Sequence, residues 1–165
     1  MRGEQARVAT LAEALRVVGE LGAKTVVLDV EPLVAYWDSG QQNLDQGVAS
    51  VLAEFTKVPG VAAVCFATNS ARRPSSNPDQ PGIRAAYLAS ANKPFRLRSY
   101  RDLPRPGVLI GDQVLTDGLL ARRLGYTFVQ YTPPEREGVP RGPWLLAQAG
   151  RLASPLLFRR PGEPT

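Results

Sequence analysis

The sequence contains no histidine and a single cysteine, Cys65. Without histidine the chain lacks the usual general base and the usual zinc ligand, which excludes a histidine-based catalytic triad. One cysteine cannot form an internal disulfide, and Cys65 lies in the apolar run VAAVCFAT, so we interpret it as a core residue. This cysteine usage fits a reducing, cytoplasmic environment.

Long apolar runs are also missing. None reaches the roughly 18 residues that a bilayer-spanning helix needs, and the N-terminus lacks the apolar core of a signal peptide. There is no RNA-binding aromatic signature, no zinc-finger spacing and no continuous Lys/Arg block. No motif therefore supports nucleic-acid binding.

The charge balance is basic, with a net charge of +5 and a pI near 9.8. One explanation is compositional, because the chain is rich in Ala, Arg, Gly and Pro. The other is an anionic partner, such as a phosphate ester, an acidic membrane surface or nucleic acid. Charge alone does not choose between them.

The length and the hydrophobic content of 44% predict one globular domain over residues 1–165. Its core is expected over about 10–132, followed by a helical tail over about 143–158. Helical spacing or helix-forming residues predict helices over 7–21, 43–58, 94–103 and 117–125. Continuous apolar runs predict strands over 25–30, 61–68, 108–112 and 126–131. Residues 69–82, rich in Pro, Ser and Asn, read as a loop.

Strands that alternate with helices predict an α/β fold with a parallel sheet covered on both faces. Ligands in such sheets bind beyond the carboxyl ends of the strands. Four polar residues stand where predicted strands end: Asp29, Thr68, Asn69 and Asp112. Asp117 follows five residues after the last of them.

Each of these residues also has an ordinary structural explanation. An acid at a strand end is often a turn residue, and the Thr68 hydroxyl can bond its own turn. Asp117 can cap the helix that follows it, and Lys93 can be a solvated loop charge. Together, however, two carboxylates at one sheet edge suit Mg²⁺, and an aspartate can attack phosphorus. A hydroxyl and an ammonium can then hold the phosphoryl oxygens.

Four motifs occur in the order LDVEPLV, FATNS, NKP and IGDQVLTD. This order resembles the haloacid-dehalogenase (HAD) superfamily of phosphotransferases, over roughly residues 10–132. The stretch IGDQVLTDGLLARRLGY is similar to the capless class IIIA phosphatases, the branch that includes phosphatidylglycerophosphate phosphatases. The resemblance implies a three-layer α/β/α Rossmann-like fold with a mostly parallel sheet of about five strands and no cap domain. The alanines of AAYLA favour a helix and its position favours a strand. The resemblance makes it a strand and places the strand of Asp29 beside that of Asp112.

The resemblance further implies a role for each matching residue. The catalytic pair would be Asp29, as nucleophile, and Glu31. The phosphate-binding residues would be Thr68, Asn69 and Lys93. The Mg²⁺ ligands would be Asp29, Glu31 through its backbone carbonyl, Asp112 and Asp117.

The first motif departs from the family pattern, because Glu31-Pro32 stands where the family has Asp-Thr. Glutamate has a suitable pKa for proton transfer, but its carboxyl lies one methylene further out. A misplacement of about 1 Å can reduce the rate roughly a hundredfold. The sequence therefore leaves three hypotheses open. The first is a working phosphatase, and the second is a catalytically impaired relative that binds a ligand or acts as a scaffold. The third, which no motif supports, is a basic nucleic-acid-binding domain.

No cap domain is inserted between the motifs, so an open site is expected. It would suit a phosphorylated small molecule or a lipid headgroup. Arg72 and Arg73 stand beside it and can guide an anion, although exposed arginines are more often solvated. The tail either packs on its own domain or lies on an anionic membrane. The residues expected to make that membrane contact are Trp144, Leu145, Leu152, Leu156, Leu157 and Phe158.

Overall fold

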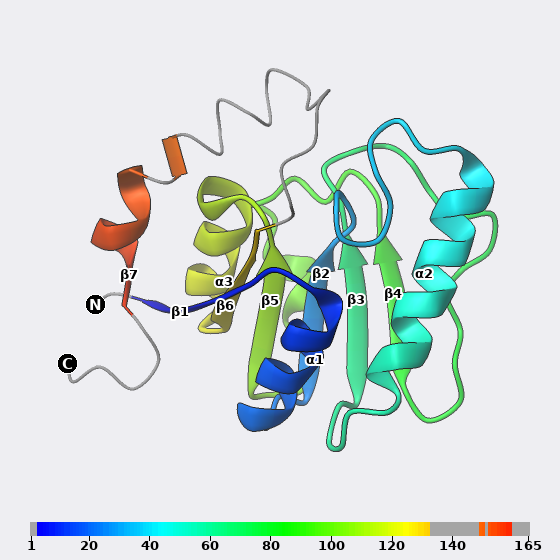
Figure 1. Cartoon of the computed structure of the whole chain (residues 1–165), viewed down its shortest axis with the longest axis horizontal. Coiled ribbons are helices and arrows are strands. Elements are labelled where there is room, and N and C mark those ends of the chain that lie inside the picture. The colour runs from blue at the N-terminus through cyan, green and yellow to red at the C-terminus, as the bar shows by residue number, and fades with distance from the viewer. Residues whose placement is uncertain (1–2, 133–148, 151, 160–165) are drawn as a thin grey trace.

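The computed structural model describes residues 3–132, 149–150 and 152–159, and it is built around one parallel sheet (Figure 1). The strand order is β4-β3-β2-β5-β6-β1-β7. The strands are β1 (Gly3–Val8), β2 (Thr25–Asp29), β3 (Ala63–Ala67), β4 (Arg84–Leu88), β5 (Gly107–Gly111), β6 (Thr127–Tyr131) and β7 (Phe158–Arg159). The predicted α/β class and parallel sheet are confirmed, with six strands and a two-residue seventh at the β1 edge.

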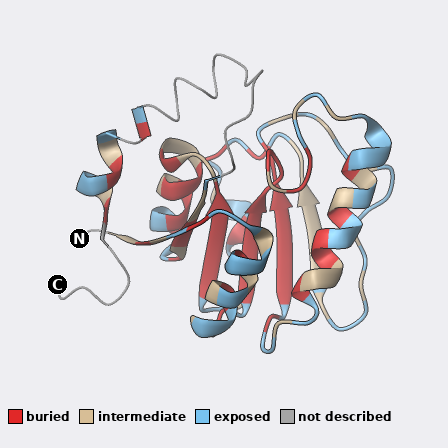
Figure 2. Ribbon diagram, viewed as in Figure 1, coloured by how far each residue is buried: buried red, intermediate tan, exposed pale blue. Residues whose placement is uncertain are grey.

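Helices cover both faces of the sheet. On one face, α1 (Leu11–Glu20) and α2 (Gln41–Phe55) pack their apolar sides on alternate residues of the central strands. On the other face lie the 3₁₀ turn η1 (Arg98–Tyr100), the π-helical turn η2 (Val114–Gly118) and α3 (Leu119–Leu124). The central strands are buried along their whole length (Figure 2). This continuous burial explains their unbroken apolar sequences.

The first strand differs from the sequence prediction, which assigned residues 7–21 to a helix. Residues 3–8 form β1, which pairs with β6, and the helix begins at Leu11. Thr10 caps the helix by accepting a hydrogen bond from the Glu13 amide, and the Glu13 carboxylate accepts one from the Ala9 amide. These two hydrogen bonds fix the start of the helix, and the strand before it was missed because GEQARV has no apolar run.

The other predicted elements agree more closely, with one exception. All of AAYLA except its last alanine belongs to β4, and residues 69–82 form a loop without a helix. The helix expected over residues 94–103 is wrong, because only η1 is helical there. Phe95 is 70% exposed while Tyr100 is buried, so the apolar residues of this segment do not share one helical face.

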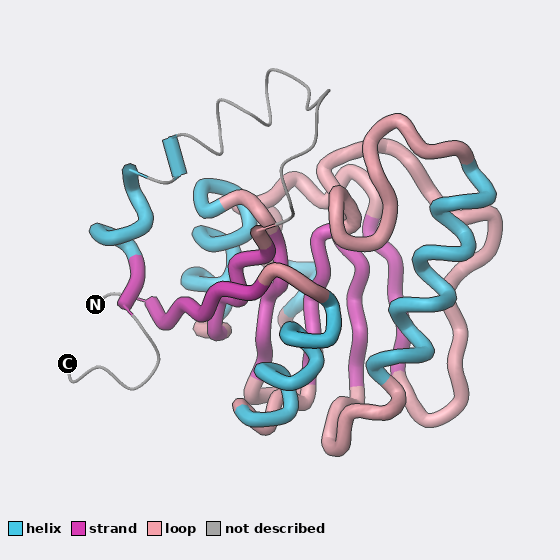
Figure 3. The backbone as a smooth tube through the Cα atoms, viewed as in Figure 1, coloured by secondary structure: helices cyan, strands magenta, loops and turns pink. Residues whose placement is uncertain are grey.

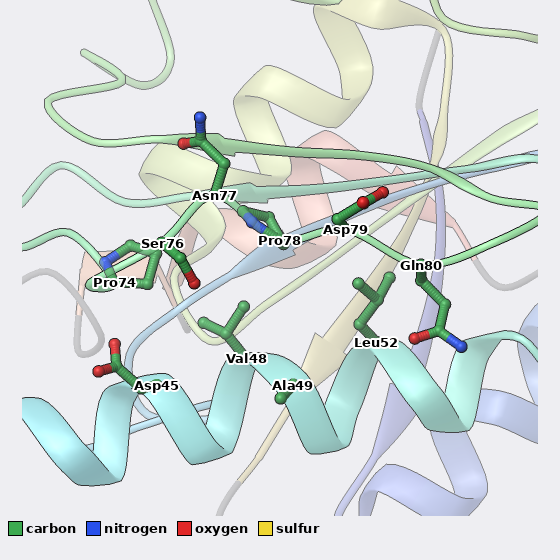
Figure 4. Close-up of a pocket in the computed structure, with 10 residues that line it drawn as sticks. All are labelled: Asp45, Val48, Ala49, Leu52, Pro74, Ser76, Asn77, Pro78, Asp79 and Gln80. Atoms are coloured by element: carbon green, nitrogen blue, oxygen red, sulfur yellow. The ribbon is translucent and has the colours of Figure 1, made fainter.

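The loop that joins β3 to β4 runs beside α2 and takes the place of a covering helix. Asp45 of α2 accepts hydrogen bonds from the Ser75 amide and hydroxyl, which hold the loop against the helix. A pocket of about 270 Å³ remains between them, and Val48 and Leu52 point into it from α2 (Figure 4). Neither this loop nor residues 30–40, between β2 and α2, inserts a cap domain over the strand ends.

Of the C-terminal residues expected to contact a membrane, some are exposed and others are buried. Leu152 and Leu156 are exposed, but Phe158 is buried against Phe128 and Leu157 packs on the same core. This end of the chain lies along the β1 edge (Figure 1). Trp144 and Leu145 lie outside the described residues. Within the described residues, no helix combines the length and the apolar character needed to cross a bilayer.

Gly47 marks the closest approach of α2 to the loop that follows β2. A Cβ atom there would collide with the backbone carbonyl oxygen of Val34. We expect Gly47→Ala to lower the free energy of unfolding by about 1–3 kcal/mol, because backbone must move to admit the methyl group. Denaturant unfolding followed by circular dichroism measures this.

The matched control is Gly19→Ala in α1, where the added Cβ would meet Val58 at an ordinary 3.7 Å. This variant should be stabilised by roughly 0.5–1 kcal/mol through helix propensity. Equal effects at the two positions would contradict the packing seen between α2 and the Val34 carbonyl.

Candidate functional site

The carboxyl ends of β2, β3 and β5 meet at one edge of the sheet, where loops gather (Figure 3). β2 pairs with β5 through Leu28 and Ile110, so Asp29 at the end of β2 lies beside the Asp112 segment. β3 pairs with β2 up to Ala67, so Thr68 lies at the same level. The predicted adjacency of the strands of Asp29 and Asp112 is confirmed. It follows directly from parallel pairing.

Three aspartates converge at this edge. Carboxylate oxygens of Asp29, Asp112 and Asp117 all lie within 4.8 Å of one another. Asp117 reaches the cluster from η2 and accepts a hydrogen bond from the Gln113 amide at 3.2 Å. A Cβ at Gly111 would come within 2.5 Å of the Asp117 carboxyl group, so only glycine admits this approach.

Lys93 forms ion pairs with two of these aspartates. Its Nζ lies 2.8 Å from Asp29 Oδ1 and 2.7 Å from Asp117 Oδ1. The Lys93 side chain is 2% exposed, so solvent hardly screens these ion pairs. Asn69 positions the lysine backbone, because its side chain accepts from the Lys93 amide at 2.7 Å and donates to the Lys93 carbonyl at 3.2 Å.

Burial and mutual repulsion set the electrostatics of the cluster. Burial, and then the nearby Asp117 charge, raise the pKa of Asp29 well above its usual value, although Lys93 opposes the rise. The same two causes raise the pKa of Asp112 to about 7. Burial lowers the pKa of Lys93, but the Asp117 and Asp29 charges outweigh burial and raise it. One ammonium thus faces three carboxylates, and a cation would relieve the excess negative charge.

These residues fit a metal ion by two criteria. All the donors are carboxylate oxygens, which hard divalent cations prefer. Asp112 Oδ1 is buried and has no hydrogen-bond partner. An unpaired buried carboxylate oxygen is costly, so a ligand at this position would be stabilising. The three aspartates could therefore hold a metal ion.

Glu31 lies near this cluster but faces a different partner. Its Oε2 accepts a hydrogen bond from the Thr68 hydroxyl at 2.6 Å, and its Oε1 lies 3.7 Å from Arg72 Nη1. The three grouped carboxylates do not include Glu31. In this arrangement the carboxylate is aimed at Thr68 and Arg72.

A pocket of about 230 Å³ opens beside the cluster, and Asp29 is the one of the three aspartates that lines it. Asp29, Glu31, Thr68, Asn69 and Lys93, all expected from the sequence, line it. Trp37, Ser70, Gln113 and Thr116 also line it and were not singled out as site residues. Their only signal in the sequence was their position inside or next to the motifs.

Two sequence interpretations change in the structure. The helix-cap role considered for Asp117 is wrong, because Gly118 precedes α3 without any side-chain cap and Asp117 is buried against Lys93. Arg72 is more than a solvated charge. Its guanidinium donates to the Tyr36 carbonyl at 2.7 Å and to the Ser39 carbonyl at 2.8 Å.

Lys93 should dominate the stability of the site. We expect Lys93→Met to lower the free energy of unfolding by about 3–5 kcal/mol, because it leaves buried carboxylates without their partner. The control is Lys57→Met, which removes an exposed ion pair to Glu54 and should change stability by less than about 1 kcal/mol. Denaturant titration of both variants measures the difference, and similar small effects would contradict a buried ion pair.

Comparison with known proteins finds no match to this chain. No family model matches the chain, and neither a curated protein nor a solved structure matches it. The similarity of the four motifs to the HAD superfamily therefore remains a resemblance. The case for a function rests on the contacts of Asp29, Lys93 and the aspartate cluster.

Proposed function

We propose that the protein is a Mg²⁺-dependent phosphomonoester hydrolase of the HAD type that works through an aspartyl-phosphate on Asp29. The observation that carries the proposal is the position of Lys93, whose ammonium joins Asp29 to Asp117 at the carboxyl ends of the strands. A nucleophilic carboxylate beside an ammonium and a hydroxyl is what phosphoryl transfer to an aspartate requires.

The reaction would have two steps. A carboxylate oxygen of Asp29 attacks phosphorus, the bond to the leaving oxygen breaks, and Glu31, which has taken up a proton from solvent after leaving Thr68, gives that oxygen the proton. Water then attacks the phosphorus and loses a proton to Glu31, and the bond between phosphorus and Asp29 breaks to release phosphate. For this role the Glu31 carboxyl group must leave Thr68, to which it is now hydrogen-bonded.

The metal ligands would come from Asp29, Asp112 and Asp117, with the backbone carbonyl of Glu31 as the fourth expected ligand. We assign Mg²⁺ because it binds through a few carboxylates and substrate phosphate. When bound, Mg²⁺ would offset the repulsion between the carboxylates and a phosphate dianion. Lys93 would hold Asp29 and contact the phosphoryl oxygens.

The substrate would be a phosphorylated small molecule or a lipid headgroup. The pocket is small, so it would admit the phosphoryl group and the adjoining part of the leaving group, with Trp37 as one wall. Because no cap covers the strand ends in the described residues, a larger leaving group could extend into solvent. Exposed Leu152 and Leu156 are the described residues left for the proposed contact with an anionic membrane.

A specific observation favours a second candidate, a binding protein without turnover. Glu31 is held by Thr68 and lies near Arg72, so the residue expected to transfer protons is engaged elsewhere. Such a protein would bind metal and phosphate but release no product.

Metal binding should show as a thermal shift. We expect Mg²⁺ at ten times its dissociation constant to add about 1.4 kcal/mol of stability, which raises the melting temperature by a few degrees. Asp112→Asn should lose this shift and, without metal, should melt at the same or a higher temperature because a repelling charge is gone.

The control is Asp102→Asn, which removes the same charge from an exposed residue and should keep the shift. Loss of the Mg²⁺ effect in the control as well, or its survival in Asp112→Asn, would disprove the proposed metal ligands.

Turnover is tested with an aryl phosphate in the presence and absence of Mg²⁺. Wild type should release phosphate only with Mg²⁺, and Asp29→Asn should lower kcat/KM by at least about a thousandfold, since the nucleophile is lost. Asp102→Asn should retain full activity.

The same assay separates the two candidates. No turnover by wild type, with activity in Glu31→Asp combined with Pro32→Thr, would support the binding protein. Activity that survives Asp29→Asn would reject the covalent mechanism.

A further inference from the structure

The Thr68 hydroxyl can serve only one anion at a time. Thr68 Oγ1 accepts a hydrogen bond from the Ser70 amide at 2.9 Å, which leaves its single proton to be donated elsewhere. That proton goes to Glu31 Oε2, at a distance of 2.6 Å. A phosphoryl oxygen that needs this donor must therefore replace the carboxylate.

Hydrogen bonds that do not involve Glu31 hold Arg72 in position. Its two terminal nitrogens donate to the carbonyls of Tyr36 and Ser39, and Nη2 lies 3.2 Å from the Ser39 hydroxyl. These bonds fix the guanidinium 3.7 Å from Glu31 Oε1. A preorganised cation of this kind can accept a different anion without rearranging.

The Glu31 carboxylate has a hydrogen bond on only one of its two oxygens. Glu31 is 5% exposed, yet its Oε1 is buried without any hydrogen-bond partner. A buried charged oxygen that lacks a hydrogen bond is held less firmly than one that is fully satisfied. The residue also lines the pocket that contains Asp29 and Lys93.

We propose that the Glu31 carboxylate is a resident anion of the site, that it occupies the oxyanion position between Thr68 and Arg72, and that a phosphoryl group binds by displacing it. Arg72 is then a further anion-binding residue. This inference rests on the proposed phosphoryl site. It also gives Glu31 two successive positions. The carboxyl group first bonds to Thr68, and after displacement it enters the pocket.

The probe is inorganic phosphate, measured by calorimetry with Mg²⁺ present. Glu31→Gln should bind phosphate about tenfold more tightly than wild type, because a neutral amide is a weaker competitor for the Thr68 proton than a carboxylate. Glu54→Gln, which removes the same charge from a surface ion pair, should bind phosphate as wild type does.

A double-mutant cycle with Thr68→Val separates displacement from simple charge repulsion. In the wild-type background Thr68→Val should change phosphate affinity less than about twofold, because the variant removes the hydroxyl from phosphate and from the competing Glu31 carboxylate alike. In the Glu31→Gln background it should weaken binding about tenfold. Circular dichroism confirms that each variant is folded.

The outcomes are distinct. A gain from Glu31→Gln that persists in full with Thr68→Val indicates repulsion alone and overturns the inference, as does the absence of any gain. If no variant binds phosphate, both the phosphoryl site and this inference are wrong. If the coupled pattern appears without turnover, hydrolysis fails as the function while the displacement stands.

Discussion

The Lys93 ammonium lies between the Asp29 and Asp117 carboxylates, away from solvent, and the rest of the site is arranged around it. A buried lysine needs partners of opposite charge, and two buried aspartates at this distance need a cation. Neighbouring residues hold Lys93 and Asp117 in this arrangement. The Asn69 side chain is hydrogen-bonded to both the amide and the carbonyl of Lys93. Gly111 leaves the space that the Asp117 carboxyl group fills.

A single ammonium does not balance the cluster. Lys93 pairs with two of the three grouped carboxylates, and burial raises the pKa of Asp29 and Asp112. Purely structural ion pairs are usually matched in charge, because unmatched buried charge destabilises the fold. The mismatch therefore favours a site that gains a cation when it functions. An orphan oxygen on Asp112 at the same position supports this interpretation.

The sequence predicted the central strands and the convergence of Asp29 and Asp112, because buried parallel strands are continuous apolar runs and their carboxyl ends must share an edge. The expectation that Asp117 and Lys93 join them came from the family resemblance alone. The sequence did not predict β1, whose alternating polar residues lie at the sheet's margin and give no apolar signal. The sequence also did not predict that Arg72 bonds to the loop after β2. Its partners are the backbone carbonyls of Tyr36 and Ser39, which are 36 and 33 positions away, and carbonyl acceptors leave no trace in residue type.

Glu31 stands where the resembling family has an aspartate, and its carboxylate bonds to a neighbouring site residue. It accepts from the Thr68 hydroxyl the hydrogen bond that a bound oxyanion would otherwise receive. Because Arg72 is held by the loop rather than by Glu31, the anion position persists when the carboxylate leaves. Under the proposed function, substrate binding and release of the Glu31 carboxyl group from Thr68 would be one event. Such coupling would weaken phosphate affinity while keeping the proton-transfer group inactive until a phosphoryl group is present, so weak binding and intact chemistry can coexist in this site.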